Sequence, residues 1–465
     1  MFCVSERAVT PMGRALSRRA LFRNVARATA AMAAVPVMQL DRAALAVAVP
    51  SPGGGKPKFY VAANGSDDAD GLTPQTAWAT IQKANATLPG DGSTLLFRRG
   101  DTFYGELEPP FGCDVSAYGD GHRPTLTMLK ILNRPDGWVR DSDNIWKIDL
   151  GTPDTHDGYT STRDANIGYL VVDGVVKPAL KYSTADLSDP WDFYGDVANH
   201  TLYVAAPDNP TTLAADIKAA PNGNAPGGTG RVVSLMAGSN DIQGLHLTGT
   251  GGCGIHGDAA DVNIHDCLVD YIGGSVLQDG TNRRFGNGIQ SWVGSKRWTV
   301  EDNEVAQVYD VAWTAQGNAG ATSGWEDITV RNNHIHDCSQ SFEFWSEGSD
   351  EASGFQRIVI EGNRCERAGY SDFSDVRPDQ NVRVHLLTYV WATPADIAIR
   401  NNVFDNAYGA YSYHARNPIG YSTYDNSIRL NAGQKIEFQR PETVEDHVDW
   451  QTETGRESGS TFEIV

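Results

Sequence analysis

Short runs of alternating apolar and polar residues recur along the second half of the chain. They lie at residues 262–267, 299–303, 329–333, 359–363 and 398–402. Such alternation predicts a half-buried strand that is closed by a turn residue. Asn303, Asn333 and Asn363 are 30 residues apart, Asn402 follows after 39, and Cys267 precedes Asn303 by 36. A period of this length predicts stacked units of one coil each.

The repeat predicts an all-β right-handed parallel β-helix, a solenoid like that of pectate lyases. A leucine-rich solenoid is the competing interpretation, but its leucine pattern is absent. An inward Asn at a tight turn tolerates left-handed backbone angles and can hydrogen-bond its counterparts in the coils above and below. We therefore expect Asn303, Asn333, Asn363 and Asn402 to superpose along the axis.

A second strand follows each turn, and its outward side chains carry the candidate chemistry. Alternation puts Phe342 and Phe344 inside and Glu343 and Trp345 outside. Stacking in register predicts one outward column of Gln290, Trp313, Glu343 and Ser412, and a second of Trp292, Trp345 and His414. Trp313 is placed only to within one residue. Gln316 lies on the same strand as Trp313, and His385 falls near the same face.

Large exposed aromatic side chains usually mark a binding surface, and indole faces stack on sugar rings. We therefore predict a glycan-binding groove on this face. The alternative is that loops cover the aromatic residues, which are then core. Two long segments, 273–286 and 369–382, lengthen their coils and are expected to wall the groove.

Hydrolysis of a glycosidic bond needs two carboxyl groups. Glu343 lies between two aromatic residues, an environment that raises the pKa of a carboxyl group toward an acid role. We expect Glu343 to be the general acid and Asp310 or Asp379 its partner; Asp375 and Glu347 are weaker candidates. The expected sugar contacts are Trp345, Trp313, Trp292, Gln290, Gln316, Arg377, His385 and His414.

The start of the chain after residue 57 resembles the opening of secreted right-handed β-helix proteins that act on polysaccharides. The resemblance rests on residues 59–67, 80–84 and 96–103. It implies a short helix that caps the first coil, where apolar core and strand edges would otherwise be exposed. The aromatic-rich stretch 135–220 breaks the repeat and is expected to be a small β-rich insertion.

A second resemblance covers roughly residues 57–420 and is to bacterial β-helix proteins known mainly from sequence. It rests on residues 285–289, 309–312, 342–345, 377–379 and 385–386. More broadly the chain is similar to β-helix glycoside hydrolases and polysaccharide lyases, although the calcium site and Lys/Arg pair of pectate lyases are not found. A lyase would need a base and a group that neutralises a uronate carboxylate. Candidates for these roles are Arg283, Arg284, Arg377, Arg383, His385 and Tyr389. A uronate epimerase and a non-catalytic glycan-binding protein are further alternatives.

The N-terminus resembles a twin-arginine export signal. Arg18 and Arg19 precede a weakly apolar stretch, and small residues suited to signal-peptidase cleavage follow near residues 44–48. Export is therefore expected, to the periplasm or outside the cell. Cys3 would be removed with this signal. The remaining cysteines, which are expected to be buried thiols, are Cys113, Cys253, Cys267, Cys338 and Cys365.

The net charge is −20, and removal of the basic first 46 residues leaves roughly −25. This charge disfavours nucleic acid and anionic membranes as partners, and no apolar run is long enough to span a membrane. The expected partner is a polysaccharide or oligosaccharide, and the expected state is a monomer or a small homo-oligomer. No cofactor is required and no metal ligands are predicted, although the Asp-rich stretch 66–70 offers a calcium site as an alternative to a solvated loop.

These observations predict the following division of the chain: 1–48 signal peptide, 49–57 linker, 58–134 N-terminal cap and first coils, 135–220 β-rich insertion, 221–440 main coils with the groove, and 441–465 C-terminal tail.

Overall fold

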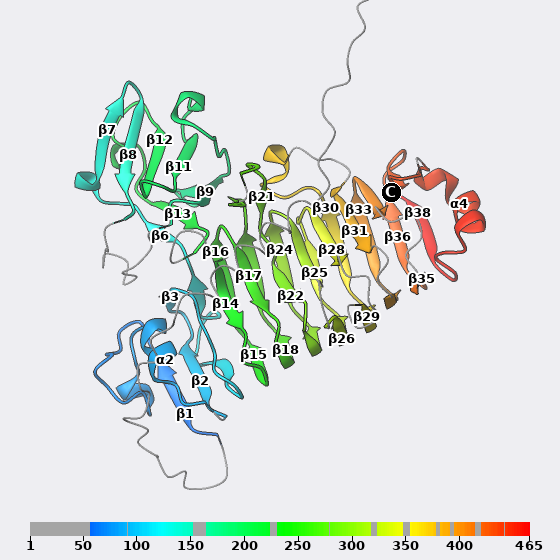
Figure 1. Ribbon diagram of the computed structural model, residues 1–465, viewed down its shortest axis with the longest axis horizontal. Helices are drawn as coiled ribbons and strands as arrows, with labels where there is room; N and C mark the ends of the chain where they lie inside the picture. The colour runs from blue at the N-terminus through cyan, green and yellow to red at the C-terminus, as the bar shows by residue number, and fades with distance from the viewer. Residues whose placement is uncertain are drawn as a thin grey trace, which may run out of the picture.

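The computed structural model describes residues 56–90, 92–151, 164–223, 230–278, 280–317, 323–346, 354–377, 382–390, 395–413, 420–440 and 442–465. Three long sheets of parallel strands run along one elongated body, and consecutive strands pass from one sheet to the next (Figure 1). The protein is therefore a parallel β-helix, as the repeat predicted. The predicted signal peptide lies outside the described residues.

We name the three sheets A, B and C in the order in which each coil visits them. Sheet A contains, in order, β1 (Lys58–Val61), β2 (Thr94–Arg98), β4 (Asp114–Tyr118), β15 (Asn240–Gln243), β18 (Ala260–His265), β23 (Lys296–Glu301), β26 (Trp325–Arg331), β29 (Phe355–Glu361), β32 (Ala395–Arg400) and β35 (Tyr421–Tyr424).

Sheet B contains β3 (Thr102–Tyr104), β5 (Thr125–Thr127), β16 (His246–Thr250), β19 (Leu268–Ile272), β24 (Glu304–Val308), β27 (His334–His336), β30 (Arg364–Ala368), β33 (Val403–Ala407), β36 (Ser427–Leu430) and β38 (Thr461–Ile464). Sheet C contains β14 (Arg231–Leu235), β17 (Cys253–Gly257), β22 (Ile289–Trp292), β25 (Val311–Gly317), β28 (Gln340–Ser346), β31 (Val384–Val390), β34 (Gly409–Tyr413) and β37 (Lys435–Glu437).

The turn from sheet A to sheet B contains the predicted asparagine ladder. The side-chain amide of Asn303 donates to Oδ1 of Asn333, Asn333 to Asn363, Asn363 to Asn402, and Asn402 to Asn426. All five are buried. The predicted backbone angle is displaced by one residue, because the left-handed position belongs to the residue before each ladder Asn, for example Asp302 and Asn332. That residue bends the chain, and the ladder Asn then points inward.

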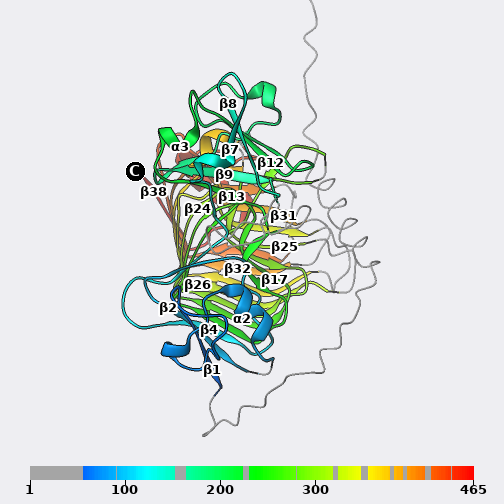
Figure 2. The same ribbon diagram turned by 90° about the vertical axis from the view of Figure 1, so that its left-hand side faces the viewer.

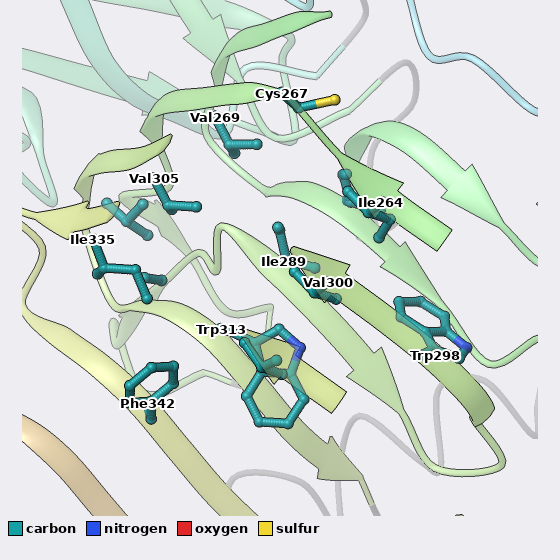
Figure 3. Packing of buried hydrophobic residues seen from close by; sticks show 14 of the residues in the cluster. Ile264, Cys267, Val269, Ile289, Trp298, Val300, Val305, Trp313, Ile335 and Phe342 are labelled. Atoms are coloured by element: carbon teal, nitrogen blue, oxygen red, sulfur yellow. The ribbon is translucent and has the colours of Figure 1, made fainter. Parts of the chain in front are cut away.

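The coils enclose a continuous apolar core, with one row of side chains from each sheet. Ile264, Val300, Val305 and Ile335 point into it from sheets A and B (Figure 3). The five described cysteines are buried and form no disulfide, as expected. Burial raises the pKa of the Cys253 thiol to about 11, so these thiols behave as apolar side chains.

Helices close both ends of the core. At the N-terminal end α2 (Ile81–Thr87) buries Ile81 and Ala84, and Figure 2 shows it near the first strands of sheet A. At the C-terminal end, the segment expected to be a tail forms α4 (His447–Thr454) and β38. Trp450 of α4 lies in the core, and β38 pairs with β36 of sheet B. These residues cover the last coil, whose core would otherwise face solvent.

Two antiparallel four-stranded sheets project from one end of the helix (Figure 1). One contains β10 (Val175–Lys177), β9 (Ile167–Val172), β13 (Ile217–Pro221) and β6 (Lys130–Ile131), and the other contains β11 (Phe193–Asp196), β12 (Thr201–Ala205), β8 (Ile145–Asp149) and β7 (Trp138–Ser142). The short helix α3 (Pro210–Leu213) lies between β12 and β13. The two antiparallel sheets share an apolar core of their own. The hydroxyl of Tyr169 in β9 donates to the carbonyl of Tyr271 in sheet B. This hydrogen bond connects the antiparallel sheets to the coils.

Within the described ranges, no helix is long and apolar enough to cross a membrane. The same residues contain no group of three or more His, Cys, Asp or Glu side chains suited to binding a metal ion.

Candidate functional site

The outer face of sheet C brings most of the predicted site residues into two columns. Gln290 pairs with Thr314, Thr314 with Glu343, Glu343 with Leu387, and Leu387 with Ser412. Beside this column, Trp292 pairs with Gln316 and Gln316 with Trp345. The sequence therefore placed Gln290, Glu343 and Ser412 on one line, and Trp292 and Trp345 on the next. His414 lies outside the described residues.

The prediction for Trp313 is wrong by one position. Thr314 occupies the outward column, whereas Trp313 is buried in the core (Figure 3). Its ring packs edge-on against that of Phe344. The cause lies at the start of each sheet C strand, where two successive side chains point inward. Ala312 and Trp313 both belong to the core, so strict alternation fails there. Trp313 is consequently not a sugar contact.

His385 is also misplaced, for the same reason. Its ring stacks on Phe404 at 5.2 Å, and its Nδ1 lies 3.1 Å from the Ser341 hydroxyl inside the coil. Burial lowers the pKa of His385 to about 3, so the ring is neutral at physiological pH. It cannot reach a ligand on the outer face of sheet C.

Exposure varies strongly along sheet C. Glu343 and Trp345 point outward, but both are fully buried. Trp345 packs against Val382, Val384 and Leu387, so the alternative interpretation, that a loop covers this aromatic residue, is correct for Trp345. Trp292, two coils earlier, is half-buried. The later coils are thus covered and the earlier coils are open.

The turn from sheet B to sheet C positions Asp310. Its Oδ1 accepts hydrogen bonds from Gln340 Nε2 and from Arg377 Nη1, each at 2.9 Å. Arg377 also donates to the carbonyl of Tyr309. These contacts hold the carboxylate of Asp310 at the edge of the sheet, four residues before the position that aligns with Glu343. Its role as the partner of Glu343 stays a prediction, and Asp379 lies outside the described residues.

Two long loops converge on the same turn. One contains the hairpin of β20 (Ser275–Val276) and β21 (Arg284–Phe285), and the other contains the 3-10 helix Ser374–Val376. From the first loop, the guanidinium of Arg284 lies 4.8 Å from the centre of the Tyr309 ring; from the second, that of Arg377 lies 5.3 Å from it. The loops therefore place two cations around one buried tyrosine.

The sequence did not lead us to predict the site residues in the first strands of sheet C. His256 pairs with Gln290, and its ring lies 5.6 Å from that of Trp292. Burial lowers the pKa of His256 to about 4. One coil earlier, Arg231 Nε donates to Glu106 Oε1 at 2.7 Å. The similarity of 254–257 to 288–291, both beginning Gly-Ile, could have identified His256 as the preceding member of the column.

Several buried polar atoms on this face have no hydrogen-bond partner within the described part of the chain. They are Asn287 Oδ1, Thr314 Oγ1, Gln340 Oε1 and His256 Nδ1. Buried polar groups are normally satisfied, and an unsatisfied one calls for an explanation such as a ligand or an ordered water. Four such atoms thus lie along sheet C, whereas the charged residues on the outer faces of sheets A and B form ion pairs such as Arg331–Glu301 and His246–Asp270.

Comparison with known proteins supports the fold. No family model and no curated protein matches the sequence. Among solved structures, the complex of XylC with xylose is 12% identical, covers 82% of this chain and 69% of XylC, and has a TM-score of 0.52. A GH136 lacto-N-biosidase from Eubacterium ramulus is 11% identical over 88% of this chain and 67% of its own, with a TM-score of 0.41. An alginate lyase from Paenibacillus is 10% identical over 77% and 93%, with a TM-score of 0.31. At 12% identity, the similarity to XylC concerns the fold alone.

Proposed function

We propose that this protein cleaves glycosidic bonds of a polysaccharide or oligosaccharide on the outer face of sheet C, by hydrolysis. The observation that carries the proposal is the set of unpartnered polar atoms at Asn287, Thr314, Gln340 and His256 beside the half-exposed Trp292. Amide, hydroxyl and imidazole groups bond sugar hydroxyls, and an indole ring stacks on the apolar face of a sugar. The xylose complex of XylC, which shares the fold, is consistent with a sugar ligand.

Hydrolysis is favoured by the carboxyl groups of the same face. Glu343 is buried between Thr314 and Leu387 in the column and lies next to Trp345. A general acid in a glycosidase gives its proton to the leaving oxygen. We assign the general acid to Glu343, with Asp310 or Asp379 as its partner.

Elimination is the second candidate, and Tyr309 favours it. The guanidinium groups of Arg284 and Arg377 lie 4.8 and 5.3 Å from the centre of its ring, and such cations could neutralise the carboxylate of a uronate. Here a base would remove the proton next to that carboxylate. The bond to the leaving oxygen would then break without addition of water.

One experiment separates these possibilities. The purified protein is incubated with a panel of neutral and uronate-containing glycans, and products are analysed for new reducing ends and for the ultraviolet absorbance of an unsaturated uronate. Hydrolysis gives new reducing ends without that absorbance, whereas elimination gives both. Tight binding of a panel member without any product would show a glycan-binding protein instead.

A further inference from the structure

The outer face of sheet C is open at its first coils. Met236 is 49% exposed there, and the neighbouring backbone segment carries Phe111, which is 53% exposed. Asp258 follows β17 directly and is half-buried, as is Trp292. Exposed apolar side chains beside a partly exposed indole provide stacking surface. A ligand that extends beyond the covered coils of Glu343 would lie here.

The charges at this open end are arranged around Arg231. Its Nε is engaged by Glu106 at 2.7 Å, and both side chains are largely buried. Burial raises the pKa of Glu106, and the neighbouring Arg231 partly offsets this; burial likewise raises the pKa of Asp258, again opposed by Arg231. The low pKa of His256, about 4, leaves its ring neutral at pH 7. Two carboxylates therefore accompany one guanidinium.

We propose that Glu106, Arg231, His256, Asp258 and Trp292 form a specificity-determining subsite, the open-end subsite, which accepts a neutral sugar unit and rejects a uronate. This inference rests on the proposed function, because it concerns the same face. Trp292 supplies the stacking surface, and the unpartnered Nδ1 of His256 bonds a hydroxyl. Glu106 binds the guanidinium of Arg231, which is therefore not available to a carboxylate of the ligand.

The physical basis is competition for one cation. A guanidinium binds a carboxylate with two parallel hydrogen bonds, the geometry in which a uronate would be recognised. While Glu106 holds the guanidinium and Asp258 adds a second negative charge, a ligand carboxylate meets repulsion in a partly desolvated site. Removing the Glu106 charge alone should convert the subsite into one that accepts an acidic sugar.

The test uses pairs of hexasaccharides that differ only in oxidation at C6. They are β-1,4-glucan and β-1,4-glucuronan, β-1,4-mannan and β-1,4-mannuronan, and α-1,4-galactan and α-1,4-galacturonan. Dissociation constants are measured by calorimetry for the wild type, Glu106→Gln and the control Glu108→Gln. Glu108 is an exposed carboxylate two residues away, whereas the hydrogen bond of Arg231 Nε is to Glu106. Both substitutions remove one negative charge.

For the wild type, we expect the neutral member of the best-binding pair to bind more tightly than its acidic counterpart. In Glu106→Gln the ratio should shift toward the acidic member by about tenfold or more, and in Glu108→Gln by less than about twofold. The double variant Glu106→Gln/Arg231→Gln should lose the shift. Thermal melting of each variant confirms that it is folded.

Three results would overturn the inference while leaving the proposed function standing: equal or tighter binding of the acidic member by the wild type, an unchanged ratio in Glu106→Gln, or equal shifts in Glu106→Gln and Glu108→Gln. A different result would defeat both. If the wild type and every variant bind none of the six hexasaccharides, or if bound sugar lies away from sheet C, the proposed function fails and the open-end subsite with it.

Discussion

The side-chain amide of Asn303 donates to Oδ1 of Asn333, one coil further along the axis, at 3.0 Å. The backbone N–H of Asn303 donates to the same oxygen. One buried amide oxygen thus satisfies two donors of the preceding coil, and the pattern repeats along the turns between sheets A and B. The ladder ties each coil to the next through side chains as well as through strands.

Asn333→Leu should therefore destabilise the β-helix. It leaves two donors of Asn303 and the carbonyl of Val300 without partners, and each orphaned group costs about 1–3 kcal/mol. Urea denaturation measures the loss in free energy of unfolding. Asn332→Gly is the control, because Asn332 is exposed and has a φ of 56°, which Gly adopts without strain. A change below about 1 kcal/mol for Asn333→Leu would show that the ladder contributes little.

The two tryptophans Trp313 and Trp292 should respond oppositely to truncation. Trp313 fills the core, so Trp313→Ala should lower the free energy of unfolding by about 3–5 kcal/mol. Trp292→Ala should weaken glycan binding with a much smaller loss of stability. Denaturation and calorimetry on both variants give the comparison. Unchanged glycan affinity in a folded Trp292→Ala variant would remove this residue from the binding face.

Asp164 predicts a specific dependence of stability on pH. Burial raises its pKa from the usual 3.8 to about 6, although the amide of Asn166 donates to Oδ1 and favours the ionised form. The folded state thus binds the proton more tightly than the unfolded state does. The free energy of unfolding should therefore fall as the pH rises from about 4 to about 6, by up to about 3 kcal/mol.

Asp164→Asn should abolish this component, because the amide cannot ionise, and should raise stability at pH 7. Unfolding curves between pH 4 and pH 7 for the wild type, Asp164→Asn and the exposed-site control Asp136→Asn measure the effect. If the wild type and Asp164→Asn have parallel pH profiles, burial of Asp164 does not perturb its proton affinity.

Export by the twin-arginine route remains a proposal that rests on the sequence of the first residues. Replacing both Arg18 and Arg19 by Lys should leave the protein in the cytoplasm, since the paired arginines are the feature that such signals present. Cell fractionation with immunodetection measures the distribution, and a single substitution at Arg7, outside the pair, is the control. Normal export of the double variant would exclude this route.

The sequence predicted the repeat well because stacking enforces one pattern in every coil. Gln290 and Glu343 were aligned correctly from periodicity alone. Trp313 was not, because two successive inward residues break the alternation at the start of each sheet C strand. The burial of Trp345 could not be inferred, since Val382 reaches it from the segment before β31, whose path depends on the whole fold. The position of His256 could have been predicted, because a Gly-Ile pair precedes it as one precedes Gln290.

The central claim of the proposed mechanism is that Glu343 is the general acid. Glu343→Gln keeps the shape of the side chain but removes the proton, and loss of a general acid typically lowers the rate by about 10²–10⁴-fold. Glu361→Gln is the matched control, because Glu361 lies on sheet A and pairs with Arg400. Its activity should equal that of the wild type.

The most direct measurement is a crystal structure of Glu343→Gln in complex with the best substrate of the glycan panel, together with its turnover rate. We predict a sugar chain on the outer face of sheet C that contacts Trp292 and Thr314, with the carboxamide at position 343 facing a glycosidic oxygen and turnover reduced at least about 100-fold. A sugar chain bound elsewhere, or a Glu343→Gln variant with full activity, would contradict this account of the site.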